Sequence, residues 1–249
     1  MNQAVKSKHW TKDVLHSSDS TELNANQSLS RPVNLNTNAK RQAYVSTSDL
    51  AWQSSPALGV LRKPLARRFS EHGHATSIVC YEAGCSFSSH SHPGGEEILV
   101  LEGIFSDEHG HYPAGSYIRN AAGSIHQPYS DSGCTLFVKL HQFQESDQLS
   151  TRIDSGNNKL YHQHSPAHSS LCLHEHKREA VYIQRYLAGS SHQAIYSYGV
   201  EILLLKGSLQ HGERTLLNGD WLRLPAGSPV QWTFLEDCEF WIKEGHLGL

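Results

Sequence analysis

The amino-acid sequence predicts an all-β protein made of two tandem domains, and three observations support this prediction. Short apolar runs of the kind that form strands, such as 75–81 and 239–243, recur along the 249 residues. The 19 glycines and frequent turn dipeptides separate these runs, and no long segment shows the 3.6-residue apolar period of an amphipathic helix.

The third observation is an internal repeat. The segment Glu97 to Gly103 (EILVLEG) matches Glu201 to Gly207 (EILLLKG) 104 residues later. Further upstream, 75–84 matches 180–189 at an offset of 105 residues, so the two copies differ in one intervening loop by one residue. The 104-residue offset also relates Gly115 to Gly219, Gly123 to Gly227, Cys134 to Cys238 and Lys139 to Lys243. A repeat of this length indicates two copies of one domain of about 100 residues.

The domain boundaries follow from composition. Residues 1–41 are rich in Ser, Asn, Thr and Gln, and we expect this segment to be disordered. The repeat then gives a first domain at 42–145 and a second at 160–249, with a polar linker at 146–159 between them.

A cluster of metal-ligating residue types lies in the first copy. His90 and His92 are two residues apart, so a strand would direct both side chains to one face. A Pro-Gly-Gly turn then delivers Glu96 at the head of the next apolar run, and His126 follows a later glycine-rich turn. Three imidazoles and one carboxylate suit zinc, iron, manganese or nickel.

These residues resemble the two sequence motifs of the cupin superfamily. Gly84, His90, His92, Glu96 and Gly103 match the first motif without a gap, and Gly115, Gly123 and His126 match the second. Ala121 and Ser130 replace a proline and an asparagine of the second motif, neither of them a ligand. The resemblance implies two tandem double-stranded β-helix (jelly-roll) barrels, with His90, His92, Glu96 and His126 holding one divalent metal ion. Zinc is the first candidate, with iron, manganese or nickel as alternatives.

The second copy lacks every one of these ligands. The repeat replaces His90 by Ala194, His92 by Tyr196, Glu96 by Val200 and His126 by Val230. Apolar and aromatic groups therefore take the ligand positions, and we expect a degenerate second barrel without metal.

Other features of the sequence favour structural explanations. Glu97 and the Tyr117-x-Arg119 pair recur in the second copy as Glu201 and Trp221-x-Arg223. Residues that are kept where the ligands are lost are expected to be structural, with Glu97 in an ion pair or a hydrogen bond. Of 18 histidines, four further His-x-His pairs are expected on the surface or in turns, and they begin at His72, His109, His162 and His174. Cys134 and Cys238 occupy equivalent positions and are most simply core residues, whereas Cys85 lies in the approach to His90, where a redox or extra-ligand role is an alternative to a structural one.

Charge and composition limit the partners. The net charge of −3 without a basic cluster argues against nucleic-acid binding, and no apolar stretch approaches 18 residues, which argues against a membrane span or signal peptide. Five cysteines without a C-x-x-C motif suit a reducing cytoplasm. The expected partner is a small molecule, and a homodimer is compatible with the sequence.

The run from Gly94 to Leu140 resembles more narrowly the cupin domain of ChrR-type anti-sigma factors. This resemblance implies small-molecule or oxidative-stress sensing, with a sigma factor as a possible partner. In that family sigma binding belongs to an N-terminal zinc domain with a His-x-x-x-Cys-x-x-Cys pattern, and no cysteine precedes Cys80 here. The alternative function is enzymatic, as an iron- or manganese-dependent dioxygenase or related cupin enzyme. No catalytic residue is assigned, and a purely structural metal is a third alternative.

Overall fold

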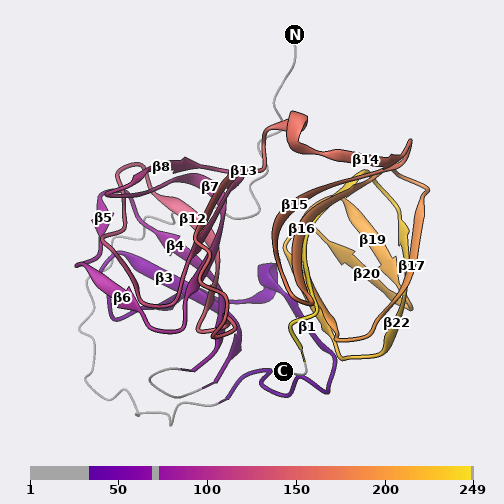
Figure 1. Ribbon diagram of the computed structural model, residues 1–249, viewed down its shortest axis with the longest axis horizontal. Helices are drawn as coiled ribbons and strands as arrows, with labels where there is room; N and C mark the ends of the chain where they lie inside the picture. Colours follow the sequence, from indigo (N-terminus) through magenta and orange to yellow (C-terminus); the bar gives the residue numbers. More distant parts are fainter. Residues whose placement is uncertain (1–33, 69–72, 248–249) are drawn as a thin grey trace, which may run out of the picture.

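The computed structural model describes residues 34–68 and 73–247, and it confirms the predicted all-β fold with two jelly-roll barrels side by side (Figure 1). Within those ranges there is no α-helix, only the two 3-10 turns η1 (Thr47–Asp49) and η2 (Asn158–Leu160). None of the helical segments in this part of the chain is long and apolar enough to cross a membrane.

The first barrel contains twelve strands. They are β2 (Gln53–Ser54), β3 (Val60–Arg67), β4 (Ala75–Tyr81), β5 (Cys85–Ser86), β6 (His90–His92), β7 (Glu96–Asp107), β8 (Gly110–Pro113), β9 (Ser116–Asn120), β10 (Ser124–His126), β11 (Tyr129–Ser130), β12 (Cys134–Leu140) and β13 (Thr151–Asp154). One large sheet has the order β13-β9-β7-β12-β4-β3-β2, with β5, β8 and β11 attached beside it, and β6 pairs with β10 in a small second sheet.

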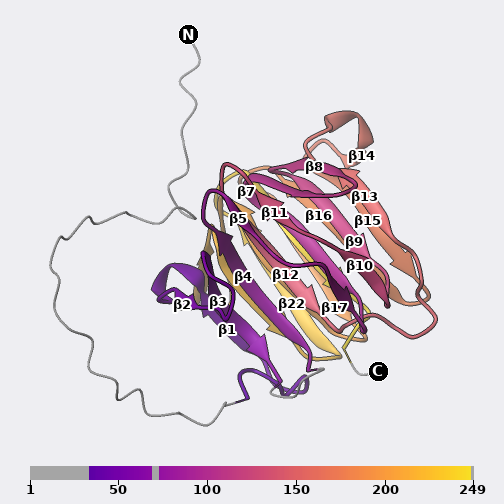
Figure 2. The ribbon, with the colours of Figure 1, turned by 90° about the vertical axis from the view of Figure 1, so that its left-hand side faces the viewer.

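The second barrel contains eleven strands. They are β1 (Ala43–Ser46), β14 (His162–Ser165), β15 (His168–His176), β16 (Glu179–Tyr186), β17 (Ser191–Tyr196), β18 (Val200–Lys206), β19 (Ser208–His211), β20 (Arg214–Leu217), β21 (Asp220–Leu224), β22 (Ser228–Phe234) and β23 (Cys238–Glu244). They form a seven-stranded sheet, β1-β21-β18-β23-β16-β15-β14, and a four-stranded sheet, β17-β22-β19-β20. Figure 2 views the molecule from the first barrel, with the second behind it.

The large sheets of the two barrels face each other, and this explains the apolar runs of the sequence. In β7 and β18 the successive residues Ile98 to Val100 and Ile202 to Leu204 are all buried. One face of each strand lines its own barrel and the other face meets the second barrel, so neither face can be polar throughout. In β17, by contrast, every second residue is exposed, because the outer face of that sheet meets solvent.

The contact between the barrels has an apolar core made by both copies. Leu99 and Phe137 of the first barrel pack in one cluster with Leu203 and Trp241 of the second. Phe137 and Trp241 occupy equivalent positions of the repeat, and their rings meet edge to face with centroids 4.9 Å apart. Equivalent residues that touch each other indicate an approximate two-fold relation between the barrels.

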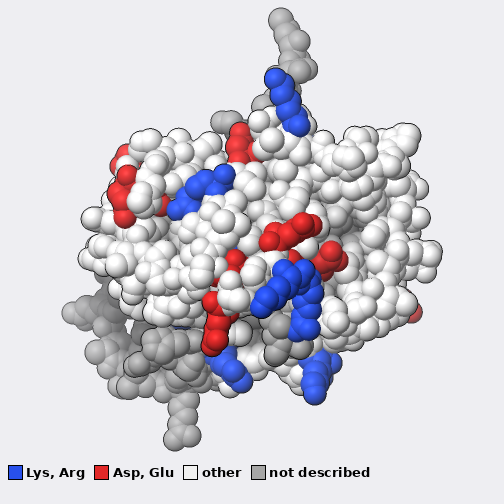
Figure 3. Space-filling model, in the orientation of Figure 1, with Lys and Arg blue, Asp and Glu red and all other residues white. Residues whose placement is uncertain are grey.

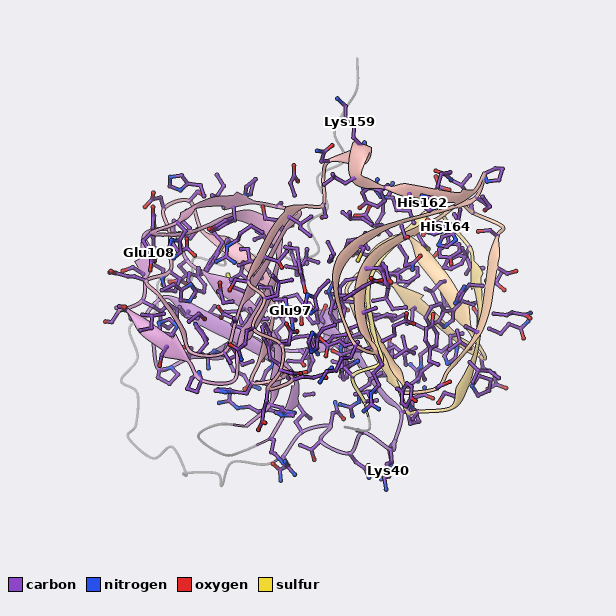
Figure 4. All side chains as sticks on the ribbon, in the orientation of Figure 1. Lys40, Glu97, Glu108, Lys159, His162 and His164 are labelled. Atoms are coloured by element: carbon purple, nitrogen blue, oxygen red, sulfur yellow. The ribbon has the colours of Figure 1, made fainter. Side chains whose placement is uncertain are left out.

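The same two-fold relation appears in buried ion pairs. Glu97 of the first barrel pairs with Lys243 of the second at 2.8 Å, and Lys139 of the first pairs with Glu201 of the second at 2.6 Å. These residues are related by the 104-residue offset, so each copy contributes one glutamate and one lysine. Glu97 lies between the barrels in Figure 4. Its predicted structural ion pair is confirmed.

Each barrel is completed by a strand that precedes the other barrel in the sequence. Strand β1 pairs with β21 of the second barrel, although the chain continues from β1 into the first. Strand β13 pairs with β9 of the first barrel, although the chain continues from β13 into the second. Since β9 and β21 are equivalent in the repeat, the exchange is reciprocal.

This exchange corrects the predicted domain boundaries at two places. Residues 43–46 were expected in the first domain, but they extend the sheet of the second. The predicted linker 146–159 contains β13 and η2 rather than only irregular chain. Both segments cover a sheet edge that would otherwise expose unpaired backbone groups.

The expected disordered segment 1–41 is described only from residue 34, and residues 1–33 lie outside the described part. The described portion is ordered: Leu35 bridges to Arg67, and the Asn36 side chain donates to the Leu65 carbonyl at 2.7 Å. Arg223 of the second barrel donates to the carbonyls of Asn36 and Asn38. Residues 34–38 therefore contact both barrels, which corrects the prediction for this part.

On the face shown in Figure 3, charged side chains gather over the first barrel and the junction between the barrels, with both signs interspersed. The described surface over the second barrel carries few charges in this view.

Candidate metal site

The local fold brings His90, His92 and His126 together as the sequence predicts. His90 and His92 lie at the ends of β6, and β10 pairs with it so that His126 is opposite His90. The turn before Glu96 needs its glycine, because Gly95 has φ of +76° and a Cβ there would lie 2.5 Å from the ring of Phe143. This tight turn places Glu96 at the start of β7, beside the imidazoles.

The distances among His92, His126 and Glu96 are those of groups that share one ion. The ligand nitrogens of the three histidines lie within 4.8 Å of one another. The Nε2 atoms of His92 and His126 are 2.9 Å apart, and Glu96 Oε2 lies 3.4 Å and 3.5 Å from them. Two ligands each about 2.1 Å from one ion, at angles of about 90° to 109°, would be about 3.0 to 3.4 Å apart.

The protonation pattern leaves lone pairs directed at this common point. His90 Nδ1 lies 2.9 Å from the Ser88 carbonyl, which can only accept, so Nδ1 carries the proton and Nε2 is free. Burial lowers the pKa of His92, as do His126 and His90, while Glu96 opposes the shift. A neutral imidazole is the form that binds a metal.

Two further residues contact the predicted ligands on the side away from their common centre. Asn120 Nδ2 donates to Glu96 Oε2 at 3.0 Å, and the two residues are cross-strand neighbours on β9 and β7. Asp107 Oδ2 faces His126 Nδ1 at 3.6 Å from a fully buried side chain. Burial raises the pKa of Asp107, but the nearby His126 imidazole and the hydrogen bonds from the His109 N–H and the Tyr112 hydroxyl outweigh it and lower the pKa. A carboxylate behind a ligating histidine orients the ring and raises its basicity.

Neither Asp107 nor Asn120 was singled out from the sequence. The signal that could have found them is the repeat itself, since Asp107 becomes His211 and Asn120 becomes Leu224 in the second copy. They change together with the predicted ligands, unlike Glu97.

In the second barrel the equivalent positions hold no comparable set. Ala194 pairs with Val230 across β17 and β22, as His90 pairs with His126 in the first barrel. Tyr196 has its hydroxyl 3.0 Å from His192 Nε2, and the Tyr186 hydroxyl lies 3.1 Å from His192 Nδ1. The rings of Tyr186 and Tyr196 thus lie beside these positions, and His192 is hydrogen-bonded to them through both nitrogens.

The other predicted sites have separate outcomes. His109, in a turn, and His162 and His164, on β14, are exposed as expected, and the latter two are labelled in Figure 4. His72 lies outside the described residues. The expectation for His174 is wrong: this residue is 4% exposed and its Nε2 lies 2.8 Å from Asp147 Oδ2. Its strand β15 faces the first barrel, so the interface rather than solvent surrounds it.

His174, Asp147 and Glu179 form a second buried group with metal-ligand atoms within 4.8 Å of one another. Arg119 already pairs with Asp147, and Lys243 pairs with Glu179 at 2.8 Å. These protein cations occupy the place of an ion, so we assign this group to the interface. Arg119 is fully buried in it, which confirms its predicted structural role.

Cys85 is buried, and its thiol donates to the Leu58 carbonyl at 3.3 Å. Burial, with a smaller effect of Glu82, raises the pKa of this thiol, which disfavours the thiolate that a redox or ligand role requires. The core explanation therefore fits better than the alternative.

Comparison with known proteins agrees with this architecture. The family model described as the ChrR cupin-like domain matches residues 40–144. Residues 40–144 are therefore a ChrR-like cupin domain. No curated protein matches the sequence.

Solved structures of similar fold share little sequence with this cupin. A Nostoc punctiforme protein proposed to be a dioxygenase is 15% identical, with a TM-score of 0.69 over 84% of this chain and 85% of that one. The Escherichia coli pirin YhhW, in complex with nickel(II), is 14% identical with a TM-score of 0.65 over 83% and 100%. An oxalate decarboxylase from Lactobacillus farciminis, in a formate complex, is 12% identical with a TM-score of 0.59 over 82% and 86%. These similarities establish the fold alone.

Proposed function

We propose that this cupin binds one divalent transition-metal ion through His90, His92, Glu96 and His126, and that the ion binds a small molecule. The observation that carries the proposal is the convergence of three imidazoles and one carboxylate at distances that suit a single ion. Four protein ligands leave one or two positions of a five- or six-coordinate ion for an oxygen-containing ligand, which the metal would polarise.

The surroundings support a small-molecule ligand. His90 is half-exposed, whereas His92 and His126 are buried, so the site has an open side. A cleft of about 510 Å³ next to it is lined by residues that include Tyr112, Asn120 and His126. The role we favour is metal-dependent sensing of a small molecule or oxidant, because the matching family model is that of the ChrR cupin-like domain. A protein partner such as a sigma factor belongs to the same proposal.

The second candidate is a metal-dependent enzyme, in particular a dioxygenase. It is supported by the three histidines whose ligand nitrogens lie within 4.8 Å of one another, by the neighbouring Glu96 carboxylate, and by the similarity in fold to a protein proposed to be a dioxygenase. The two candidates share the metal site and differ in whether the bound molecule is converted.

The test is metal analysis of protein purified without oxygen, together with oxygen-uptake assays on small diketones, phenols and thiols. We expect about one equivalent of tightly bound iron, manganese, nickel or zinc. Iron with substrate-dependent oxygen consumption would favour the enzyme, and zinc without turnover would favour sensing. Protein that binds no divalent ion under any loading condition would overturn both candidates.

A further inference from the structure

Arg152 lies on β13, the strand that precedes the second barrel in the sequence and completes the sheet of the first (Figure 1). Each of its three side-chain nitrogens donates to a protein oxygen. Nε donates to the Tyr112 hydroxyl at 3.2 Å, one terminal nitrogen to the Arg119 carbonyl at 2.9 Å, and the other to Asn120 Oδ1 at 2.6 Å. Arg152 is therefore engaged within the protein, although its side chain is 32% exposed.

The first bridge from Arg152 leads to Glu96. Because a guanidinium can only donate, its contact fixes Oδ1 as the Asn120 atom that faces it. Asn120 Nδ2 must then point the other way, where it donates to Glu96 Oε2 at 3.0 Å. Arg152 thereby determines the orientation of the Asn120 amide, so that its NH2 group, and not its oxygen, faces the Glu96 carboxylate.

The second bridge leads to His126. Tyr112 accepts from Arg152 and donates its own proton to Asp107 Oδ1 at 3.1 Å. The other carboxylate oxygen, Asp107 Oδ2, lies 3.6 Å from His126 Nδ1. Asp107 Oδ1 is thus held by the Tyr112 hydroxyl and the His109 N–H, and this leaves Oδ2 facing the imidazole.

The second barrel provides an internal comparison for this network. Arg152 pairs with Ile118 and Tyr44 pairs with Leu222, and these two partners are 104 residues apart, so Tyr44 is the counterpart of Arg152. The other members are replaced as well: Asp107 by His211, Tyr112 by Leu216 and Asn120 by Leu224.

The residues of the interface between the barrels behave in the opposite way. Glu97, Arg119 and Lys139 are retained as Glu201, Arg223 and Lys243. The network is therefore lost together with the ligands and is not part of what the two barrels need in order to assemble.

We propose that Arg152 is a positioning residue of the metal site, which holds Glu96 through Asn120 and His126 through Tyr112 and Asp107. The inference rests on the proposed metal binding. It adds that a strand outside the predicted first domain sets the geometry of the ligands, so that the exchange of strands between the barrels and the affinity for metal are coupled.

The experiment compares Arg152→Met and Arg152→Lys with the wild type in zinc and cobalt(II) affinity, measured by competition with a chromophoric chelator. We expect Arg152→Met to weaken both metals by about 10- to 100-fold, the usual effect of losing such a support. Arg152→Lys should recover part of the loss, because an ammonium can still donate to Asn120. The absorption spectrum of the cobalt(II) form should change in Arg152→Met, which a defect of stability alone would not cause.

Coupling and a control complete the test. Asn120→Ala should weaken the metal as well, and Arg152→Met combined with Asn120→Ala should lose less than the product of the two separate effects, because both act on Glu96. Tyr44→Phe, the matched change in the second barrel, should leave affinity and spectrum unchanged. If Arg152→Met does not fold, Asn120→Ala and Arg152→Lys still report on the network.

The outcomes separate this inference from the proposed function. Wild-type affinity and an unchanged cobalt spectrum in Arg152→Met or, if it does not fold, in Asn120→Ala would overturn the positioning role and leave the metal site intact. If His126→Ala binds the metal as tightly as the wild type does, the proposed metal site itself is overturned.

Discussion

The two barrels differ in their interiors and agree on the faces that meet. In the first barrel, imidazoles and a carboxylate occupy the positions that hold Ala194, Tyr196, Val200 and Val230 in the second. At the interface both copies keep a glutamate and a lysine, and these pair reciprocally across the two-fold relation. Of these charged residues, the glutamate and lysine found in both copies serve assembly, whereas the ligands found only in the first copy serve the site.

The physical reason for the concerted change is the cost of burying polar groups. A buried carboxylate or imidazole without a partner loses its hydration and gains nothing in return. If the second copy no longer binds an ion, Glu96 and its supports would each be such an uncompensated group at the equivalent place. Val200 and Leu224, which stand there instead, are both buried.

The largest effect expected from this comparison is on metal content. His126→Ala should reduce the bound metal from about one ion per chain to nearly none, because the site loses a ligand. Val230→Ala, the matched change in the second barrel, should leave the metal unchanged. The measurement is elemental analysis after dialysis. Two tightly bound ions in the wild type, or metal loss in Val230→Ala, would contradict the assignment of the site to the first barrel.

Substitutions of the adjacent glutamates Glu96 and Glu97 should have separate effects, one on metal binding and the other on stability. Glu96→Gln should weaken metal binding by removing the only anionic ligand, with little effect on the unfolding free energy of the metal-free protein. Glu97→Gln should keep the metal but lower the unfolding free energy by about 1.5–3 kcal/mol, because it removes one of the two carboxylates, Glu97 and Glu179, that pair with the buried Lys243. Urea unfolding and metal analysis of both variants check this. The reverse result would mean that Glu97, not Glu96, points to the site.

The interface should also give the protein a specific sensitivity to acid. Burial raises the pKa of Glu97, but Lys243, Arg119 and Lys139 outweigh this and lower the pKa from the usual 4.5 to about 2. A lowered pKa means that the charged group stabilises the fold above about pH 4.5 and that this stability is lost as the pH falls towards 2. Between pH 6 and 3 the unfolding free energy of the wild type should therefore fall more steeply than that of Glu97→Gln. Parallel curves for the two proteins would contradict the ion-pair explanation.

The smallest effect concerns the N-terminal segment. Removing residues 1–33 should leave the melting temperature unchanged, as expected for a polar sequence of this composition. Removing residues 1–41 should cost about 1–3 kcal/mol, because the buried Arg223 loses the carbonyls of Asn36 and Asn38. Thermal unfolding of the two truncated proteins measures the difference. Equal melting temperatures would show that these contacts do not matter.

Much of this architecture was accessible from the sequence because it repeats. The 104-residue offset predicted two copies of one domain, the residues that replace the ligands in the second copy and the structural role of Glu97, and the resemblance to the cupin motifs implied that each copy is a barrel. The ligand set itself stays a prediction, supported by the convergence of His90, His92 and His126. The alternation of residues along a strand and the glycines of turns are local patterns, and local patterns can be recognised in a single sequence.

What the sequence did not predict depends on contacts between distant segments. Nothing local in Ala43–Ser46 or Thr151–Asp154 specifies which sheet edge it joins, because a strand of four residues fits either edge. The burial of His174 and the contacts of Arg152 follow from that assembly and were missed with it. The sequence of a His-x-His pair does not show whether the pair lies on the surface or in an interface, so the burial of His174 could not be predicted from it.

The strand exchange also has a consequence for the order in which the protein can be made. The Tyr44 hydroxyl bonds Asp220, 176 residues further along the chain, so β1 emerges from the ribosome long before its partner strand exists. The first barrel, by contrast, receives its last strand, β13, only a few residues after its own sequence ends. During synthesis the metal ligands and Arg152 can therefore come together while β1 is still unpaired. Strand β1 is fixed only when the second barrel closes.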